Sequence, residues 1–238
     1  MIKILRKKIK SSFYYELVTN FFSNFKKSYA ESFGEDLFVN YFFQEKKKGL
    51  YVDVGCNLPK SRSLTYQLYR KSWNGIKIDI SPRSIKLNNF IRPKDKNLNL
   101  SIGDKEKEVE SFIFYHNCSM NTVDKHFKKF TEKSVNKKPS VFKIKQLKLD
   151  TVLKKNNVNK IDYLNIDVEG NEEQVLSGFS IKNYKPDLVS IEIHDKDCPP
   201  LKNKLYKYFV KNNYYLVSIY GWTYFFSRKK SLLIHFNT

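Results

Sequence analysis

The feature that most constrains this fold is an alternation of short apolar runs with longer helical segments, which starts at Leu50. The apolar runs are rich in Val, Ile, Leu and Tyr and are bounded by Gly, Pro, Asn or Asp, as is typical of buried strands. Strands that alternate with helices are joined by right-handed crossovers and form a parallel sheet. The sequence therefore predicts an α/β protein with a mostly parallel sheet.

The pattern predicts strands at 50–54, 75–80, 98–102, 110–115, 143–149, 161–166, 187–193, 214–219 and 223–227. It predicts helices at 35–43, 63–71, 83–90, 151–156, 171–176 and 201–211. The last two strands flank Gly221 and Trp222, so they should form a hairpin-like end. The Lys-rich stretch 125–138 has few apolar residues, and we expect it to be a mobile surface segment, either a lid or a solvated loop.

Length and composition are those of one folded domain with an N-terminal extension. The chain has 238 residues, of which 41% are hydrophobic and 16% aromatic, which is too much apolar surface for a disordered chain. We expect a basic, aromatic-rich helical extension over 1–27 and a single domain over 28–238. The extension could lie on a membrane as an amphipathic helix, but packing on the domain is the simpler interpretation.

The net charge of +20 has two interpretations. A basic surface could bind nucleic acid or an anionic membrane. However, Lys, Asn, Ile, Phe and Tyr are abundant throughout the chain, which indicates a general compositional bias rather than a binding patch.

The cysteines give no sign of a metal or disulfide framework. Cys56, Cys118 and Cys198 lie far apart without ligand-like spacing. No run approaches the roughly 18 apolar residues of a membrane span, and no signal peptide is evident. A reducing cytoplasm fits these features, and we expect a cytoplasmic protein.

Polar residues stand where predicted strands end. They are Asp53, Asp79, Asp104, Asp167 and His194. Because parallel strands end at one edge of the sheet, these side chains should surround one crevice, which is where open α/β sheets bind ligands. Asp79 stands at the end of the second strand, where a carboxylate can accept hydrogen bonds from both hydroxyls of a ribose. The turn after the first strand has a single glycine, Gly55, so a nucleoside with a zwitterionic or sulfonium tail is favoured over NAD.

Each of these residues also has a purely structural interpretation. Asp53 could cap a turn, and Asp79 could cap the helix that follows it. Asp167 and Glu169 could form salt bridges at a strand end, and His194 could be a hydrogen-bonded edge residue.

Several motifs in a consistent order give the chain a family resemblance. They are Tyr29-Ala-Glu-Ser-Phe-Gly-Glu-Asp36, Val52-Asp-Val-Gly-Cys-Asn57, Ser63-Leu-Thr-Tyr66, Trp73-Asn-Gly-Ile-Lys-Ile-Asp79 with Pro82, Arg92-Pro93, and Ile166-Asp-Val-Glu-Gly170 with Glu172 and Val175-Leu176. In these motifs the chain resembles the FkbM family of S-adenosylmethionine-dependent methyltransferases, over residues 29–194. Cys56 replaces the family's Ala, and Glu31 replaces its Gln. Residues 119–140 match poorly, so we expect substrate choice to reside there.

The resemblance implies a Rossmann-like class I methyltransferase fold, with a mostly parallel seven-stranded sheet, an antiparallel last strand and helices on both faces. Its cofactor would be S-adenosyl-L-methionine. By analogy with the family, the residues that bind this cofactor would be Asp53, Gly55 and Asn57 at the methionyl part, Asp79 at the ribose, Ile102 and Asp104 at the adenine, and Glu35 and Asp36 at the N-terminal side of the pocket.

The catalytic candidates are Asp167, Glu169 and His194. Transfer of a methyl group to a hydroxyl also requires that the hydroxyl proton leave, so His194 or Asp167 would be the general base and Glu169 would position the substrate. Alternatively, the three residues could hold a divalent cation that acidifies the hydroxyl, although nothing else in the sequence indicates a metal.

The leading hypothesis is an S-adenosylmethionine-dependent O-methyltransferase that acts on a hydroxyl of a sugar, glycan or secondary-metabolite acceptor. A nucleic-acid methyltransferase is the first alternative, which the net charge favours. Against it, the sequence has no Asn-Pro-Pro-Tyr type base-binding motif and no aromatic-basic recognition module. A non-catalytic module that contacts a membrane through the basic residues 1–10 is the second alternative.

Overall fold

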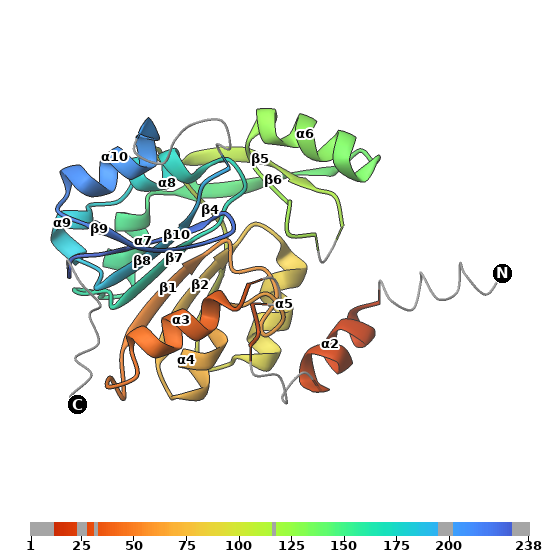
Figure 1. Cartoon of the computed structure of the whole chain (residues 1–238). Coiled ribbons are helices and arrows are strands. Elements are labelled where there is room, and N and C mark those ends of the chain that lie inside the picture. Colours follow the sequence, from red (N-terminus) through yellow and green to blue (C-terminus); the bar gives the residue numbers. More distant parts are fainter. Residues whose placement is uncertain (1–11, 23–27, 31–32, 116–117, 195–201, 230–238) are drawn as a thin grey trace.

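Parallel strands dominate the larger of two sheets, and helices cover both of its faces (Figure 1). The structure is a computed structural model that describes residues 12–22, 28–30, 33–115, 118–194 and 202–229. The strands are β1 (Leu50–Val54), β2 (Asn74–Asp79), β3 (Lys96–Asn99), β4 (Ser101–Ile102), β5 (Lys107–Ile113), β6 (Ser140–Leu147), β7 (Tyr163–Ile166), β8 (Leu188–Glu192), β9 (Tyr215–Tyr220) and β10 (Thr223–Ser227). The helices are α2 (Phe13–Phe22), α3 (Glu35–Phe42), α4 (Tyr66–Arg70), α5 (Pro82–Ile91), α6 (Lys125–Val135), α7 (Leu149–Lys155), α8 (Glu172–Ser177), α9 (Ile181–Tyr184) and α10 (Lys204–Lys211).

The larger sheet has seven strands in the order β3-β2-β1-β7-β8-β10-β9. The pairs from β3 to β8 are parallel, whereas β10 is antiparallel to both of its neighbours. The expected mostly parallel sheet with an antiparallel last strand is therefore confirmed. The strand order reverses between β1 and β7, which is the position where open α/β sheets bind ligands at the carboxyl ends of the strands.

A second sheet of three strands, in the order β4-β6-β5, stands beside the first (Figure 1). The prediction of one continuous strand at 98–102 is wrong, because the chain changes sheets at Leu100. Up to Asn99 the backbone pairs with β2, and from Ser101 it pairs with β6. The strands expected at 110–115 and 143–149 are present as β5 and β6, and they pair with each other in this second sheet.

Most of the Lys-rich stretch is a helix, α6, so the prediction of a solvated loop is wrong, whereas the prediction of a mobile lid stays a prediction. Asp124 caps the helix by accepting a hydrogen bond of 2.6 Å from the backbone N–H of Phe127. The half-buried Phe127 and the fully buried Thr131 lie one helical turn apart, whereas Phe130 is exposed. Phe127 and Thr131 give α6 an inner face, which the abundance of lysine obscured in the sequence.

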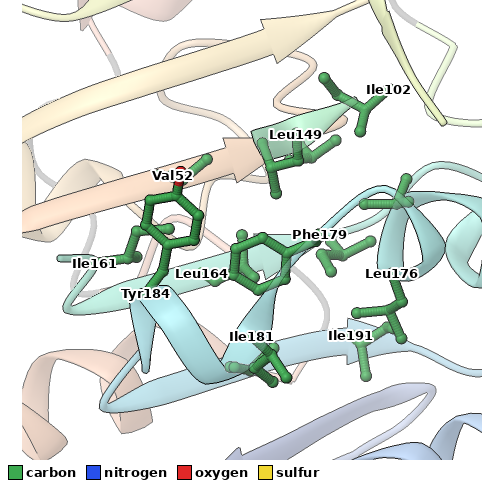
Figure 2. Packing of buried hydrophobic residues seen from close by; sticks show 14 of the residues in the cluster. Val52, Ile102, Leu149, Ile161, Leu164, Leu176, Phe179, Ile181, Tyr184 and Ile191 are labelled. Atoms are coloured by element: carbon green, nitrogen blue, oxygen red, sulfur yellow. The ribbon is translucent and has the colours of Figure 1, made fainter. Parts of the chain in front are cut away.

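Each face of the large sheet carries its own hydrophobic core. The face covered by α7, α8, α9 and α10 is apolar along the whole length of the strands, as Figure 2 shows for Val52, Leu164 and Ile191. The opposite face, covered by α3, α4 and α5, is apolar only at the start of the strands. Tyr51 and Tyr163 lie in this second core, whereas the next residues on the same face, Asp53 and Asn165, are buried and polar. That change of polarity places buried polar side chains near the carboxyl edge of the sheet.

Helix α2 packs on α5, in agreement with the simpler of the two interpretations for residues 13–22. Its inward residues are polar: Glu16 is buried and accepts a hydrogen bond of 2.7 Å from Arg83 on α5. Tyr14, Val18 and Phe21 are exposed. The basic stretch 1–10 lies outside the described residues. Within the described part of the chain, no helix is both long and apolar enough to cross a bilayer.

Candidate active site

Two adjoining cavities lie at the carboxyl edge of the large sheet. The first, here the β2-side cavity, is lined by Asp79 and Ile102 among others. The second, here the acidic cavity, has a volume of about 390 Å³, which is within the range of small-molecule sites. Among the described residues, the acidic cavity is lined by five carboxylates and one guanidinium: Glu35, Asp53, Asp167, Glu169, Glu192 and Arg62. Gly55, Asn57, Ser119 and Asp167 line both cavities, so the two form one continuous site.

Gly55 allows a close approach of two strand ends at the boundary between the two cavities. Its φ is +84°, in the left-handed region that favours glycine. A Cβ atom at this position would lie 1.6 Å from the backbone oxygen of Asp167. The ends of β1 and β7 therefore touch backbone to backbone, and any side chain at Gly55 would push them apart.

Asp79 ends β2 on the wall of the β2-side cavity. One carboxylate oxygen accepts a hydrogen bond of 2.7 Å from the backbone N–H of Ser81, and the other accepts one of 2.8 Å from the N–H of Asn57. The N-cap of α5 is Ser81 and not Asp79. Burial raises the pKa of Asp79 to about 6, although these two hydrogen bonds act in the opposite direction.

Asp53 is buried at the base of the acidic cavity in a network of hydrogen bonds. One of its oxygens accepts a bond of 2.8 Å from Thr65, and the other accepts one of 2.9 Å from the amide of Asn165. The ammonium group of Lys77, which is fully buried, lies 3.7 Å from the Asp53 carboxylate, and Ser190 donates to Asn165 over 2.6 Å. Asp53 therefore joins strands β1, β2, β7 and β8 beneath the cavity.

The remaining predicted cofactor residues are not all in the cavities. Glu35 lies in the first turn of α3 and lines the acidic cavity, and burial raises its pKa. Asp36 is fully buried and accepts hydrogen bonds from the side chain of Ser28 and the backbone N–H of Tyr29. Asp36 lines neither cavity, and the same is true of Asp104. Their expected contacts with a cofactor stay predictions.

The three catalytic candidates lie together with a fourth residue, Glu192. Nε2 of His194 is 3.4 Å from the Glu169 carboxylate and 3.1 Å from the Glu192 carboxylate. Asp167 lies beside this group and lines both cavities. Sequence reasoning missed Glu192, yet Glu192 and His194 are two residues apart at the end of one strand, so the alternation of side chains could have indicated that both face the same way.

The cluster has strongly shifted pKa values. Burial lowers the pKa of His194, but its contacts with Glu169 and Glu192 outweigh burial and raise this pKa to about 10. Burial raises the pKa of Glu169 to about 7 against the opposing effect of His194. Burial and the negative charge of Glu192 raise the pKa of Asp167 well above its usual range. Burial also acts to raise the pKa of Glu192, but His194 holds it below its usual value.

The backbone around this cluster is tightly held. Glu169 has φ of +56°, which is uncommon for a residue with a side chain, and Gly170 follows with φ of +100°. Thr122 donates a hydrogen bond of 2.7 Å to the Glu169 carbonyl, and the Glu172 carboxylate accepts from the backbone N–H of Gly170. The turn after β7 is thus fixed in a conformation that aims Glu169 at the acidic cavity.

Comparison with known families identifies the chain. A model of the methyltransferase FkbM domain matches residues 53–216, from the end of β1 into β9. The chain belongs to this family. The match confirms the resemblance drawn from the sequence motifs, and it identifies this FkbM protein as a methyltransferase with a Rossmann-like fold. No curated protein and no solved structure gave a significant match.

The two cavities of this FkbM protein differ in chemistry. The β2-side cavity combines two carboxylates, Asp79 and Asp167, with apolar side chains such as Ile80 and Ile102. Its bare backbone at Gly55 opens towards the acidic cavity, where carboxylates suit a positively charged group. Glu169, Glu192 and His194 present ligand atoms that all lie within 4.8 Å of one another, which is a suitable spacing for a metal ion.

We predict that Gly55→Ala destabilises the protein far more than Gly34→Ala. Both glycines have positive φ, +84° and +76°, but a Cβ at Gly34 would meet nothing closer than 3.4 Å. Gly34→Ala should therefore cost only about 1 kcal/mol for the backbone conformation. Gly55→Ala should cost at least about 3 kcal/mol, because overpacking against Asp167 adds to this backbone cost. Urea unfolding of both variants measures the difference, and equal losses would show that the contact between β1 and β7 is not tight.

Proposed function

We propose that this FkbM protein is an S-adenosylmethionine-dependent O-methyltransferase that acts on a hydroxyl of a sugar, glycan or secondary-metabolite acceptor. One observation carries the proposal. Within the segment that matches the family model, Asp79, Gly55 and Asp167 converge on two joined cavities at the strand-order reversal. The polar and apolar groups of this pair of cavities match a cofactor with a nucleoside at one end and a charged sulfonium at the other.

In this proposal the adenosyl part of the cofactor occupies the β2-side cavity. The Asp79 carboxylate accepts hydrogen bonds from the ribose hydroxyls, and Ile80 and Ile102 contact the adenine. The cavity has a volume of about 40 Å³, so a nucleoside must displace side chains of the segment 118–123 that contribute to its wall. The methionyl part passes over Gly55 and Asn57 into the acidic cavity, where Arg62 suits its carboxylate.

The bound cofactor supplies a methyl group on a positively charged sulfur. The bond from this carbon to sulfur breaks as the bond to the acceptor oxygen forms, and the hydroxyl proton must leave. We place the acceptor oxygen beside Asp167, because this residue lines both cavities and so lies between the methyl donor and the acceptor space. The Asp167 carboxylate receives the proton, while the remaining residues of the acidic cavity orient the acceptor.

The first functional prediction concerns cofactor binding. Asp79→Ala should weaken the binding of S-adenosylhomocysteine by about 2 kcal/mol or more, roughly thirtyfold, because two charge-assisted hydrogen bonds to the ribose are lost. Isothermal titration calorimetry measures this change. Asp187→Ala is a matched control, since Asp187 precedes β8 at the opposite edge of the sheet and pairs with Arg228 over 3.0 Å. Unchanged affinity in Asp79→Ala would show that the ribose is placed wrongly.

The second prediction follows from the pKa of Asp79, which burial raises to about 6. Only the ionised carboxylate accepts hydrogen bonds at both oxygens, so affinity for S-adenosylhomocysteine should be constant above pH 7 and fall as the pH drops through 6. At pH 5 it should be about tenfold weaker, since roughly a tenth of Asp79 is then ionised. Asp79→Asn should bind weakly with no such dependence. A wild-type dissociation constant equal at pH 5 and pH 8 would contradict this assignment.

The third prediction concerns the acceptor. Incubation with labelled S-adenosylmethionine and a panel of glycans and sugar nucleotides should give a methyl ether on one acceptor class. Asp167→Asn should keep its affinity for S-adenosylhomocysteine but lose turnover by on the order of a hundredfold, because it removes the proton acceptor. Label incorporated only into RNA or DNA, with binding that weakens steeply in salt, would support the nucleic-acid alternative instead.

A further inference from the structure

We propose that Glu169, Glu192 and His194 bind a divalent cation at the wall of the acidic cavity, and that this ion holds the acceptor oxygen. The second half of this proposal rests on the proposed O-methyltransferase function, whereas the binding of the ion does not. The three residues come from two neighbouring strand ends, because Glu169 follows β7 and Glu192 and His194 lie at the end of β8. Their ligand atoms all lie within 4.8 Å of one another.

The distances suit a shared coordination sphere. Ligand atoms at right angles around an ion, each bonded at about 2.1 Å, lie about 3 Å apart. Nε2 of His194 lies 3.4 Å from Oε2 of Glu169 and 3.1 Å from Oε2 of Glu192. Small side-chain movements would therefore bring all three onto one ion. Glu169 and Glu192 also line the acidic cavity, so the remaining positions on the ion would face the space proposed for the acceptor.

The hydrogen bonding around the cluster is incomplete without a further positive group. Oδ1 of Asp167 is buried and has no hydrogen-bond partner among the described residues. Oε2 of Glu192 and Nε2 of His194 are also buried, and they form an ion pair of 3.1 Å that lacks hydrogen-bond geometry. Buried polar atoms in proteins almost always have a hydrogen-bond partner, so this cluster is unusual. An ion and its water ligands would satisfy them.

The charge of the cluster leads to the same conclusion. Asp167, Glu169 and Glu192 are three carboxylates that line the acidic cavity beside the imidazole of His194. Burying several like charges is costly unless they are paired or coordinate a metal. A divalent cation would balance the charge, and Asp167, which is not among the three ligands, would remain available to accept the proton of the acceptor hydroxyl.

The ligands are already oriented for this role. The His194 ring contacts two aromatic rings, with centroid distances of 5.2 Å to Phe127 on α6 and 5.6 Å to Trp222 in the turn before β10. The backbone of Glu169 is held by Thr122. Ligands that are fixed before the ion arrives lose little conformational entropy on binding. Two carboxylates with one imidazole suit ions such as Mn²⁺ better than Mg²⁺, which prefers oxygen ligands alone.

The experiment is a titration of the full chain with Mn²⁺, after dialysis against a chelator and without any methyl donor. Calorimetry should detect one site in the wild-type protein, and Glu192→Gln and His194→Gln should each weaken Mn²⁺ binding at least about tenfold. Glu173→Gln is a matched control on α8, where the exposed Glu173 forms a surface ion pair of 3.9 Å with Lys204. The control should bind Mn²⁺ as the wild type does.

Absence of a Mn²⁺ site in the wild type, or equal affinity in all variants, would overturn the proposal. The affinity for S-adenosylhomocysteine and the circular dichroism spectrum of each variant report whether it is folded. If His194→Gln does not fold, Glu192→Gln alone provides the test. Because Mn²⁺ is titrated without a methyl donor, failure here would leave the cofactor assignment intact. Failure of the Asp79→Ala prediction would likewise leave the Mn²⁺ result intact.

Discussion

The close contact between the ends of β1 and β7 is the constraint on which the rest of the site depends. At Gly55 the backbone approaches the carbonyl of Asp167 so closely that a Cβ would lie 1.6 Å from it. The same two residues line both cavities, so the contact forms the boundary between them. A strand pair with ordinary side chains at this point would separate the two strand ends. The carboxylate of Asp167 would then no longer lie next to the turn that the cofactor is proposed to cross.

Beneath this contact, one face of the sheet changes from apolar to polar along the strand direction. Tyr51, Tyr163 and Leu188 belong to the core, and the residues two positions later are Asp53, Asn165 and Ser190. Each of these polar residues is hydrogen-bonded to a neighbouring strand, which avoids the cost of burying unsatisfied groups. The network therefore fixes the positions of the strands that carry the site, while the opposite face remains fully apolar and supplies the hydrophobic stability.

The sequence predicted those parts of the fold that depend on local pattern. The strands at 50–54 and 223–227 have the expected bounds, and Asp79 and Asp167 stand at strand ends that line the cavities. The errors arose where a non-local partner decides the outcome. The strand expected at 98–102 is divided because Ser101 and Ile102 pair with β6, which lies some forty residues later in the chain. Glu192 was missed because its role depends on Glu169, which the chain brings close only through the pairing of β7 with β8.

The positive net charge of the whole chain suggests an anionic ligand, whereas the carboxylates of the site favour a cationic one. The chain carries +20, whereas the described lining of the acidic cavity has five carboxylates and one guanidinium. Screening by salt limits the electrostatic effect of the surface lysines to short distances. The electric field inside the cavity is therefore set by the residues that line it. Two cations are proposed for this region, the sulfonium near Gly55 and the metal ion at His194. In these proposals Asp167 lies between the two cations and interacts with both, which reduces their mutual repulsion and keeps the proton acceptor at the point where the new bond forms.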